Sequence, residues 1–118
     1  MADSPLIIKS KEFALQIIKV CNYVKQTKKE SVLTNQLIRS GTSVGANIRE
    51  AFYGHGTADF IAKLQIALKE ASETGKWLEM LYRTEYISEE LYKHLNKLCS
   101  TIRILLIKSI TTAKENNI

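Results

Sequence analysis

The sequence predicts an all-α protein, an antiparallel up-down-up-down four-helix bundle. Its 118 residues include only one proline and five glycines, too few for the many tight turns of a β-sandwich or a β-barrel. Apolar residues recur at helical spacing in four stretches, and connections of about three to five residues between them force successive helices to lie antiparallel. At 13.4 kDa the chain suits one globular domain over residues 1–118.

The first helix is expected over roughly residues 5–28. Ser4 followed by Pro5 is typical of a helix cap and first turn. The apolar positions that recur at helical spacing after this pair are Phe13, Ile17, Val20, Cys21 and Val24. The polar run at residues 26–30 then ends the pattern.

The second helix is expected to be capped by Ser31 and to end near the segment Gly54-His55-Gly56, because two glycines so close together break a helix. Its apolar face carries Leu37, Val44 and Ile48, among others.

Thr57 is expected to cap a third helix that continues to about Tyr86. Ser88 then begins a capping signal for a fourth helix, with Glu89 and Glu90 in the first turn, where the helix dipole favours acidic side chains.

Composition and charge indicate the cellular compartment of the protein and the class of partner that it attracts. The chain has 17 Lys+Arg against 12 Asp+Glu, a net charge of +5, which attracts polyanions without requiring them. Cys21 and Cys99 are interpreted as buried, reduced thiols of a cytosolic protein, with a disulfide or metal pair as the alternative. The first residues lack a signal-peptide pattern, and no apolar run reaches the roughly 18–20 residues of a membrane span. We therefore expect a cytoplasmic protein with no membrane partner.

The usual signatures of catalysis and of cofactor binding are missing from the sequence. It has no phosphate-binding glycine loop, no CxxC pair and no recognisable nucleophile motif. Glu90 and His94 have helical spacing but lack further ligands of the right type, and His55 is expected in a solvent-exposed turn. The sequence thus predicts no enzyme, no metal site and no cofactor.

Nucleic-acid binding is the stronger functional class, because the basic residues of the fourth helix occupy one arc opposite its core face and can neutralise phosphates without reading bases. Basic residues on the second helix extend this surface. The predicted nucleic-acid-binding residues are Arg39, Arg49, Lys93, Lys97, Arg103 and Lys108. The alternative is that the basic residues of the fourth helix form a solvated face or ion pairs between subunits.

A helical wheel places additional apolar residues away from the expected core. The third helix carries Ile66, Trp77 and Leu81 on the side of Glu70 and Glu73, and the fourth carries Ile104 and Ile107 within its basic arc. Contact between two such different strips would be heterologous and would close into a ring at a suitable rotation, with Trp77 as the anchor. The alternative is that these are ordinary exposed apolar residues.

Small side chains are concentrated in the middle of the second helix. Ser40, Gly41 and Val44 share the apolar face, so that a neighbouring helix can approach closely there. Asn47 lies at the edge of this face, where a structural hydrogen bond is expected in preference to a catalytic role.

Residues 43–50 read SVGANIRE. This segment resembles the Ser-(Ile/Val)-x-x-Asn-hydrophobic-x-Glu signature of the four-helix-bundle family encoded in intervening sequences of bacterial 23S ribosomal RNA genes, with Ser43, Asn47 and Glu50 as the motif residues. The likeness continues through the apolar and Glu-rich pattern of residues 64–79. Where other members have Ala-Glu-Gly after the Asn-Ile pair, this chain has Arg49-Glu50-Ala51.

The resemblance implies a cytoplasmic, non-enzymatic four-helix bundle that assembles as a homopentamer. That family is also similar to the accessory protein of diversity-generating retroelements, a pentameric barrel that binds a reverse transcriptase and nucleic acid, which extends the expectation to an RNA-linked role. Two functions therefore stay open. One is an oligomeric module that binds RNA or DNA; the other is a protein-interaction scaffold with no physiological nucleic-acid ligand. They differ in whether the basic arc stays exposed after assembly.

Overall fold

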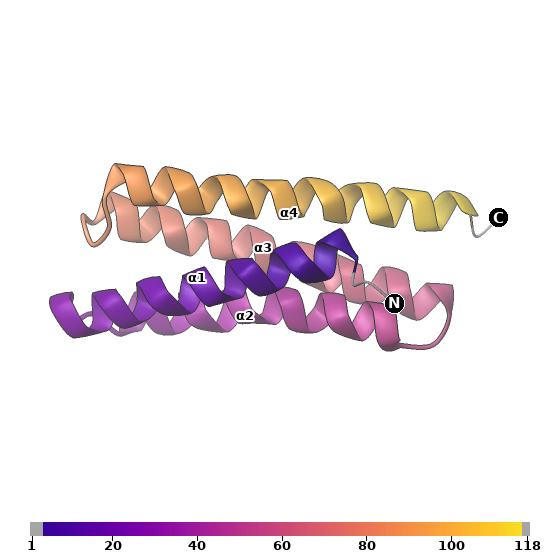
Figure 1. The fold of residues 1–118 in the computed structure, drawn as a ribbon, viewed down its shortest axis with the longest axis horizontal. Coiled ribbons are helices and arrows are strands. Elements are labelled where there is room, and N and C mark those ends of the chain that lie inside the picture. Colours follow the sequence, from indigo (N-terminus) through magenta and orange to yellow (C-terminus); the bar gives the residue numbers. More distant parts are fainter. Residues whose placement is uncertain (1–3, 117–118) are drawn as a thin grey trace.

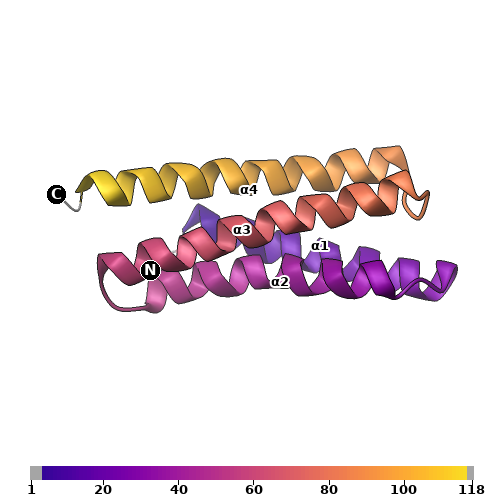
Figure 2. The same ribbon diagram turned by 180° about the vertical axis from the view of Figure 1, so that it is seen from behind.

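The computed structural model describes residues 4–116 as four helices, α1 (Pro5–Lys28), α2 (Val32–Tyr53), α3 (Gly56–Arg83) and α4 (Glu89–Asn116). Successive helices run antiparallel in a body of 50 × 24 × 19 Å (Figure 1). Seen from behind, α3 lies between α2 and α4 (Figure 2). The predicted all-α four-helix bundle is confirmed. Residues 1–3 and 117–118 of the domain predicted over 1–118 lie outside the described residues.

Two of the predicted helix caps are confirmed. The hydroxyl of Ser4 accepts a hydrogen bond from the backbone N–H of Ile7 at 3.2 Å, and that of Ser88 accepts one from Leu91 at 3.1 Å. Ser31 stands at the N-cap of α2, as predicted, but its side chain does not accept a capping hydrogen bond. Glu30 takes that role, since its two carboxylate oxygens accept the N–H groups of Leu33 and Thr34 at 2.7 and 3.0 Å.

The boundaries of α3 also differ from the prediction. The helix begins at Gly56, whose φ of 79° suits glycine, so His55 and not Thr57 stands at the N-cap. It ends at Arg83 rather than near Tyr86. The chain reverses through Glu85, at φ 66°, and the N–H of Tyr86 donates to the carbonyl of Leu81 at 2.9 Å. This fold-back closes the end of α3 and leads into α4.

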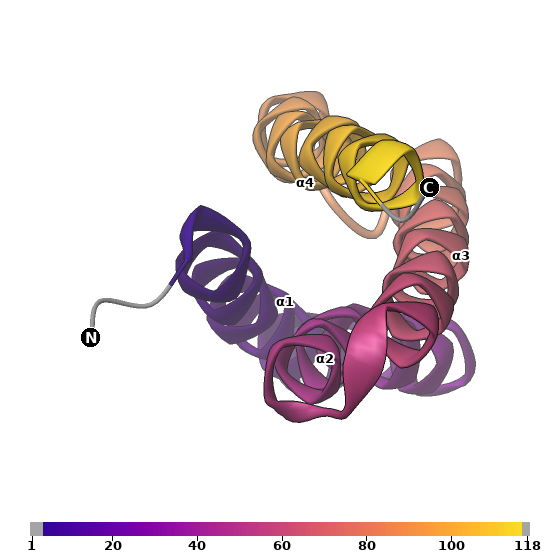
Figure 3. The ribbon, with the colours of Figure 1, turned by 90° about the vertical axis from the view of Figure 1, so that its right-hand side faces the viewer.

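The buried core runs along the inside of the four helices and includes Phe13, Ile17, Leu37, Leu78 and Leu106. Viewed along the bundle, the helices follow one another around an arc with α1 and α4 on either side of its opening (Figure 3). The α2–α3 contact is the most extensive of the bundle, and the α1–α4 contact is the least extensive. The junction of the first and last helices is thus the most open part of the fold.

Both cysteines are free and buried, as predicted for reduced thiols. The thiol of Cys21 donates to the carbonyl of Thr34 on α2 at 3.5 Å, and that of Cys99 donates to the carbonyl of Ala71 on α3 at 3.2 Å. Burial raises the pKa of each thiol to about 11. Each thiol therefore stays neutral at physiological pH and links two neighbouring helices.

Candidate nucleic-acid interface

The signature residues of α2 have structural roles. The side-chain amide of Asn47 donates to the carbonyl and the hydroxyl of Ser43 at 2.9 and 3.1 Å, which confirms the predicted structural hydrogen bond. The carboxylate of Glu50 lies 3.5 Å from the ammonium of Lys63 on α3. The Asn47 contacts satisfy a partly buried amide within α2, and the exposed pair of Glu50 and Lys63 connects α2 with α3.

The small residues of α2 allow the close packing that the sequence predicts. A Cβ atom added to Gly41 would lie 2.9 Å from the Cγ2 atom of Ile17 on α1. On the α3 side, the hydroxyls of Ser40 and Thr74 lie 3.0 Å apart and are both buried. Helix α2 is thus tightly packed against both neighbours.

Arg39, one of the predicted nucleic-acid contacts, is engaged within the chain. Its guanidinium lies 3.3 Å from the carboxylate of Glu70 and 2.8 Å from that of Glu73, both on α3. The hydrogen bond to Glu73 and the negative charge of Glu70 raise the pKa of Arg39. Two carboxylates surround this cation, so its charge is offset and it adds little attraction for a polyanion.

Lys93 is likewise paired with a carboxylate, here one turn away on its own helix. Its ammonium lies 2.8 Å from the carboxylate of Glu89. The hydrogen bond between them lowers the pKa of Glu89 and raises that of Lys93. Both side chains are exposed, so the pair is weak, but it lowers the positive charge at this end of α4.

The other four predicted contacts, Arg49, Lys97, Arg103 and Lys108, are exposed and form no ion pair with any carboxylate in residues 4–116. Arg49 on α2 stands 5.8 Å from the centroid of the Tyr53 ring, a cation–π contact that leaves its charge uncompensated. The structure does not gather the four into one cluster, since Arg49 is on α2 and the others are on α4.

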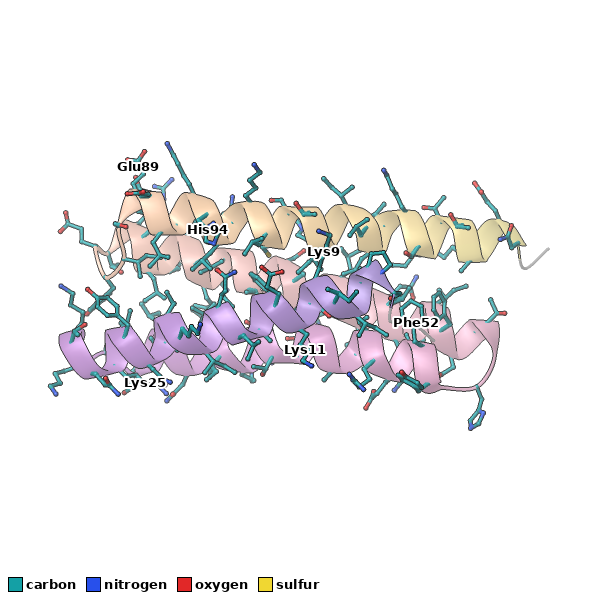
Figure 4. All side chains as sticks on the ribbon, viewed as in Figure 1. Lys9, Lys11, Lys25, Phe52, Glu89 and His94 are labelled. Atoms are coloured by element: carbon teal, nitrogen blue, oxygen red, sulfur yellow. The ribbon has the colours of Figure 1, made fainter. Side chains whose placement is uncertain are left out.

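The lysines of α1 are not among the predicted nucleic-acid contacts. Lys9, Lys11 and Lys19 are all exposed. Lys11 and Arg49 line a groove of about 290 Å³ between α1 and α2, whose floor includes Ala14, Gly45 and Ala46. Figure 4 shows Lys9 on the opposite side of α1, toward α4. The spacing of Lys9 and Lys11 places them on two different sides of the first helix. The sequence alone does not show which neighbouring helix lies on each side, so their role could not be predicted.

The predicted interface residues divide into an exposed and a buried set. Ile66 on α3 is 43% exposed, and Ile104 and Ile107 on α4 are 54% and 49% exposed. Leu81 is 0% exposed, so its prediction as an interface residue is wrong. It lies in the last turns of α3, where the fold-back at Tyr86 returns the chain to the carbonyl of Leu81 and brings in the buried side chain of Ile87.

Trp77, the predicted anchor of that interface, is partly buried and packs against the core. The ammonium of Lys76 lies 4.6 Å from the centroid of its ring. Its indole N–H is buried and has no hydrogen-bond partner in the described part of the chain. Glu70 and Glu73 share the single positive charge of Arg39, so one of the two negative charges of the predicted strip is offset within the chain.

Neither a cluster of metal ligands nor a membrane-spanning helix is found within residues 4–116. Within residues 4–116, no three His, Cys, Asp or Glu side chains come together in a way that would hold a metal ion. No helix in this part of the chain combines the length and the apolarity that crossing a bilayer requires. His55 is exposed at the N-cap of α3.

Fold and surface together define an all-α four-helix-bundle protein whose signature residues are structural and whose outer surface carries uncompensated cations. The family model of the 23S rRNA-intervening sequence protein matches residues 3–108. The chain belongs to this family.

A solved structure from Bacteroides thetaiotaomicron VPI-5482, a protein of unknown function from the S23 ribosomal protein family, is similar to the chain. The two share 50% sequence identity with a TM-score of 0.88, over 89% of this chain and 97% of the other. None of the curated proteins matches.

Proposed function

We propose that the chain is a cytoplasmic, non-catalytic binding module that forms a homopentameric ring and binds structured RNA or other nucleic acid through its basic helix surfaces. The observation that carries this proposal is the set of exposed cations without a carboxylate partner in residues 4–116, which are Arg49, Lys97, Arg103 and Lys108. Such cations release counterions when they neutralise phosphates, and the binding needs no base-specific contact.

The family supports an RNA-linked role, since its name refers to 23S ribosomal RNA and the similar solved structure comes from the S23 ribosomal protein family. The two buried free thiols are typical of a protein in a reducing compartment, which supports the cytoplasm.

Assembly is supported by apolar residues that the protomer leaves uncovered. Ile66 on α3 and the pair Ile104 and Ile107 on α4 belong to different surfaces of the same chain. Contact between these two surfaces is heterologous and closes into a ring when the rotation between neighbours permits it. Leu81 has no part in this contact because it is buried, and Trp77, which is partly buried, can contribute only the part of its side chain that stays exposed.

A protein-interaction scaffold is the second candidate function. It is favoured by Ile8 and Leu15, which are exposed apolar residues on the outer face of α1, away from both proposed ring surfaces. Exposed apolar groups near one another mark contact sites for other proteins.

Fluorescence anisotropy distinguishes the two functions. Nuclease-treated protein is titrated into a labelled RNA hairpin and into a duplex DNA of matched length, at low and at near-physiological salt. We expect binding that weakens with salt, and a loss of affinity when Lys97 and Lys108 are both changed to Gln. The matched control is Lys93→Gln, which removes a lysine already paired with Glu89 and leaves affinity close to that of the unchanged protein. Absence of binding even at low salt would exclude nucleic acid and favour the scaffold.

A further inference from the structure

Helices α1 and α4 leave a cavity of about 360 Å³ between them, toward the α3–α4 turn. We define the seam by the residues that line this cavity, namely Gln16, Lys19, Val20 and Tyr23 of α1 and Leu91 and Leu95 of α4. Its lining is mainly apolar, and its volume lies in the range of small-molecule sites in proteins. This place is the open side of the arc in Figure 3.

Tyr23 forms an aromatic wall of the seam. The residue is 51% exposed. A second cavity of about 490 Å³ shares Tyr23 and Leu91 with the first and adds Tyr82 and Tyr86. The ring of Tyr82 is itself stacked on that of Tyr92, with ring centroids 4.7 Å apart. Several aromatic rings therefore lie at this end of the seam, and Tyr23 lines both cavities.

One polar contact crosses the seam. The imidazole Nε2 of His94 on α4 lies 2.8 Å from the side-chain oxygen of Gln16 on α1. Figure 4 shows His94 on the side of α4 that faces α1. The amide of Gln16 and the imidazole of His94 therefore lie beside the apolar lining of the seam. A planar heterocycle with polar edges needs both an apolar surface and hydrogen-bonding groups.

The charges along the two facing stripes favour an anion. Residues three, four or seven positions apart share one helix face. We call the residues that share a face with Gln16 the α1 stripe, and those that share a face with His94 the α4 stripe. The α1 stripe carries Lys9, Glu12 and Lys19, and the α4 stripe carries Glu90 and Lys97. The two stripes thus carry three lysines and two glutamates within the described helices. Glu85 and Glu89 line only the second cavity, together with Lys28, so the excess of lysines lies along the α1 and α4 stripes, where phosphates are favoured.

We propose that the seam binds an unpaired nucleotide of a bound RNA, with the base stacked on Tyr23 and the neighbouring phosphates along the α1 and α4 lysines. The inference rests on the proposed function and adds to it a preference for unpaired over fully paired nucleic acid. Exposed aromatic rings beside a basic groove are the usual means of holding unpaired bases, because every base has a face that can stack. An amphipathic protein helix would use the apolar floor, but only an acidic one would pair with the lysines, whereas every RNA segment carries phosphates on both sides of its bases.

The test compares two RNA probes and three variants. One probe is a hairpin with an unpaired loop that contains 2-aminopurine, and the other is a blunt RNA duplex of equal length. The variants are Tyr23→Ala, Tyr23→Phe and Leu15→Ala, the last as a control because Leu15 is an equally exposed side chain of α1 that does not line the seam. Circular dichroism verifies that each variant keeps its helical content.

We expect the hairpin to bind more tightly than the duplex and its 2-aminopurine fluorescence to be quenched on binding. Tyr23→Ala should weaken hairpin binding on the order of tenfold and remove the quenching, with duplex binding unchanged. Tyr23→Phe keeps the stacking ring, so both readouts should be retained, as they should be with Leu15→Ala.

Three results would overturn the proposal in distinguishable ways. If both probes bind equally and Tyr23→Ala changes nothing, the seam proposal fails while charge-led binding stands. If Tyr23→Ala lowers the mass of the protein in solution without changing hairpin affinity, the seam is a contact between copies of the chain. If neither probe binds at low salt, the proposed function fails together with the seam proposal.

Discussion

The hydroxyl of Thr74 on α3 and that of Ser40 on α2 lie 3.0 Å apart in the interior of the bundle. Each also lies within hydrogen-bond distance of a carbonyl of its own helix, Thr74 with Glu70 at 2.7 Å and Ser40 with Leu37 at 3.3 Å. Both side chains are buried, so the pair satisfies polar groups that would otherwise be costly to remove from water. It also favours one register of α2 against α3, next to the signature segment.

Thr74→Val keeps the shape of the side chain and removes its hydroxyl, which deprives Ser40 of its partner on α3. We expect the free energy of unfolding in urea to fall by about 1–3 kcal/mol. Thr101→Val is the matched control, since the Thr101 hydroxyl bonds only to the carbonyl of Lys97 on its own helix. An equal effect of the two substitutions would show that the contact between helices contributes nothing.

Glycine-to-alanine changes at two helical positions should have opposite effects on the stability of the protein. At Gly41 the new methyl group would lie 2.9 Å from the Cγ2 atom of buried Ile17, and the overpacking is expected to cost about 1–3 kcal/mol, more than the gain in helix propensity. At Gly75 the nearest atom is the sulfur of Cys99 at 4.0 Å, so Gly75→Ala should stabilise by about 0.5–1 kcal/mol. Thermal unfolding of both variants checks this. A Gly41→Ala protein as stable as the unchanged chain would contradict the close approach of α1.

The buried cysteines predict a loss of stability at alkaline pH. Desolvation raises the pKa of Cys21 and of Cys99 from 9.0 to about 11 in the folded protein. Between these values the unfolded chain loses thiol protons that the folded chain retains, so the free energy of unfolding falls as the pH rises from about 9 to about 11. A variant with both cysteines changed to Ala should show a smaller decline in urea titrations over this range. Equal slopes for the two proteins would contradict the raised pKa values.

Assembly can be tested by placing charge on the proposed ring surface of α4. The double change Ile104→Glu and Ile107→Glu should lower the mass measured by analytical ultracentrifugation while helical content is retained, because both residues are about half exposed in the protomer. Val32→Glu is the control, since Val32 is exposed at the start of α2 and lies outside the proposed surfaces. An unchanged mass for the double variant would remove this surface from the ring.

Sequence periodicity predicted the fold well because each helix carries a continuous apolar face and short connections leave few alternative arrangements. The caps at Ser4 and Ser88 were predictable because they are local, since each hydroxyl bonds to a backbone N–H only three residues away. Glu30 was missed as a cap because its carboxylate reaches across Ser31, a residue type that is preferred at that position.

The site was predicted less completely because its charges depend on contacts between helices. Arg39 is separated from Glu70 and Glu73 by more than 30 residues, so nothing local shows that its charge is offset. Leu81 lies off the core face on a wheel, yet the turn after α3 covers it. The position of Tyr23 beside α4 likewise requires the packing of the first helix against the last.

The most direct test of nucleic-acid binding through the basic helix surfaces is the slope of log affinity for the RNA hairpin against log salt concentration, measured for the unchanged protein, the Lys97→Gln/Lys108→Gln variant and Lys93→Gln. We expect a steep decline for the unchanged protein, with a slope shallower by about 0.7–0.9 for each lysine lost in the double variant. Lys93→Gln should keep the full slope. An affinity that does not change with salt, or a double variant with the slope of the unchanged protein, would contradict nucleic-acid binding through these surfaces.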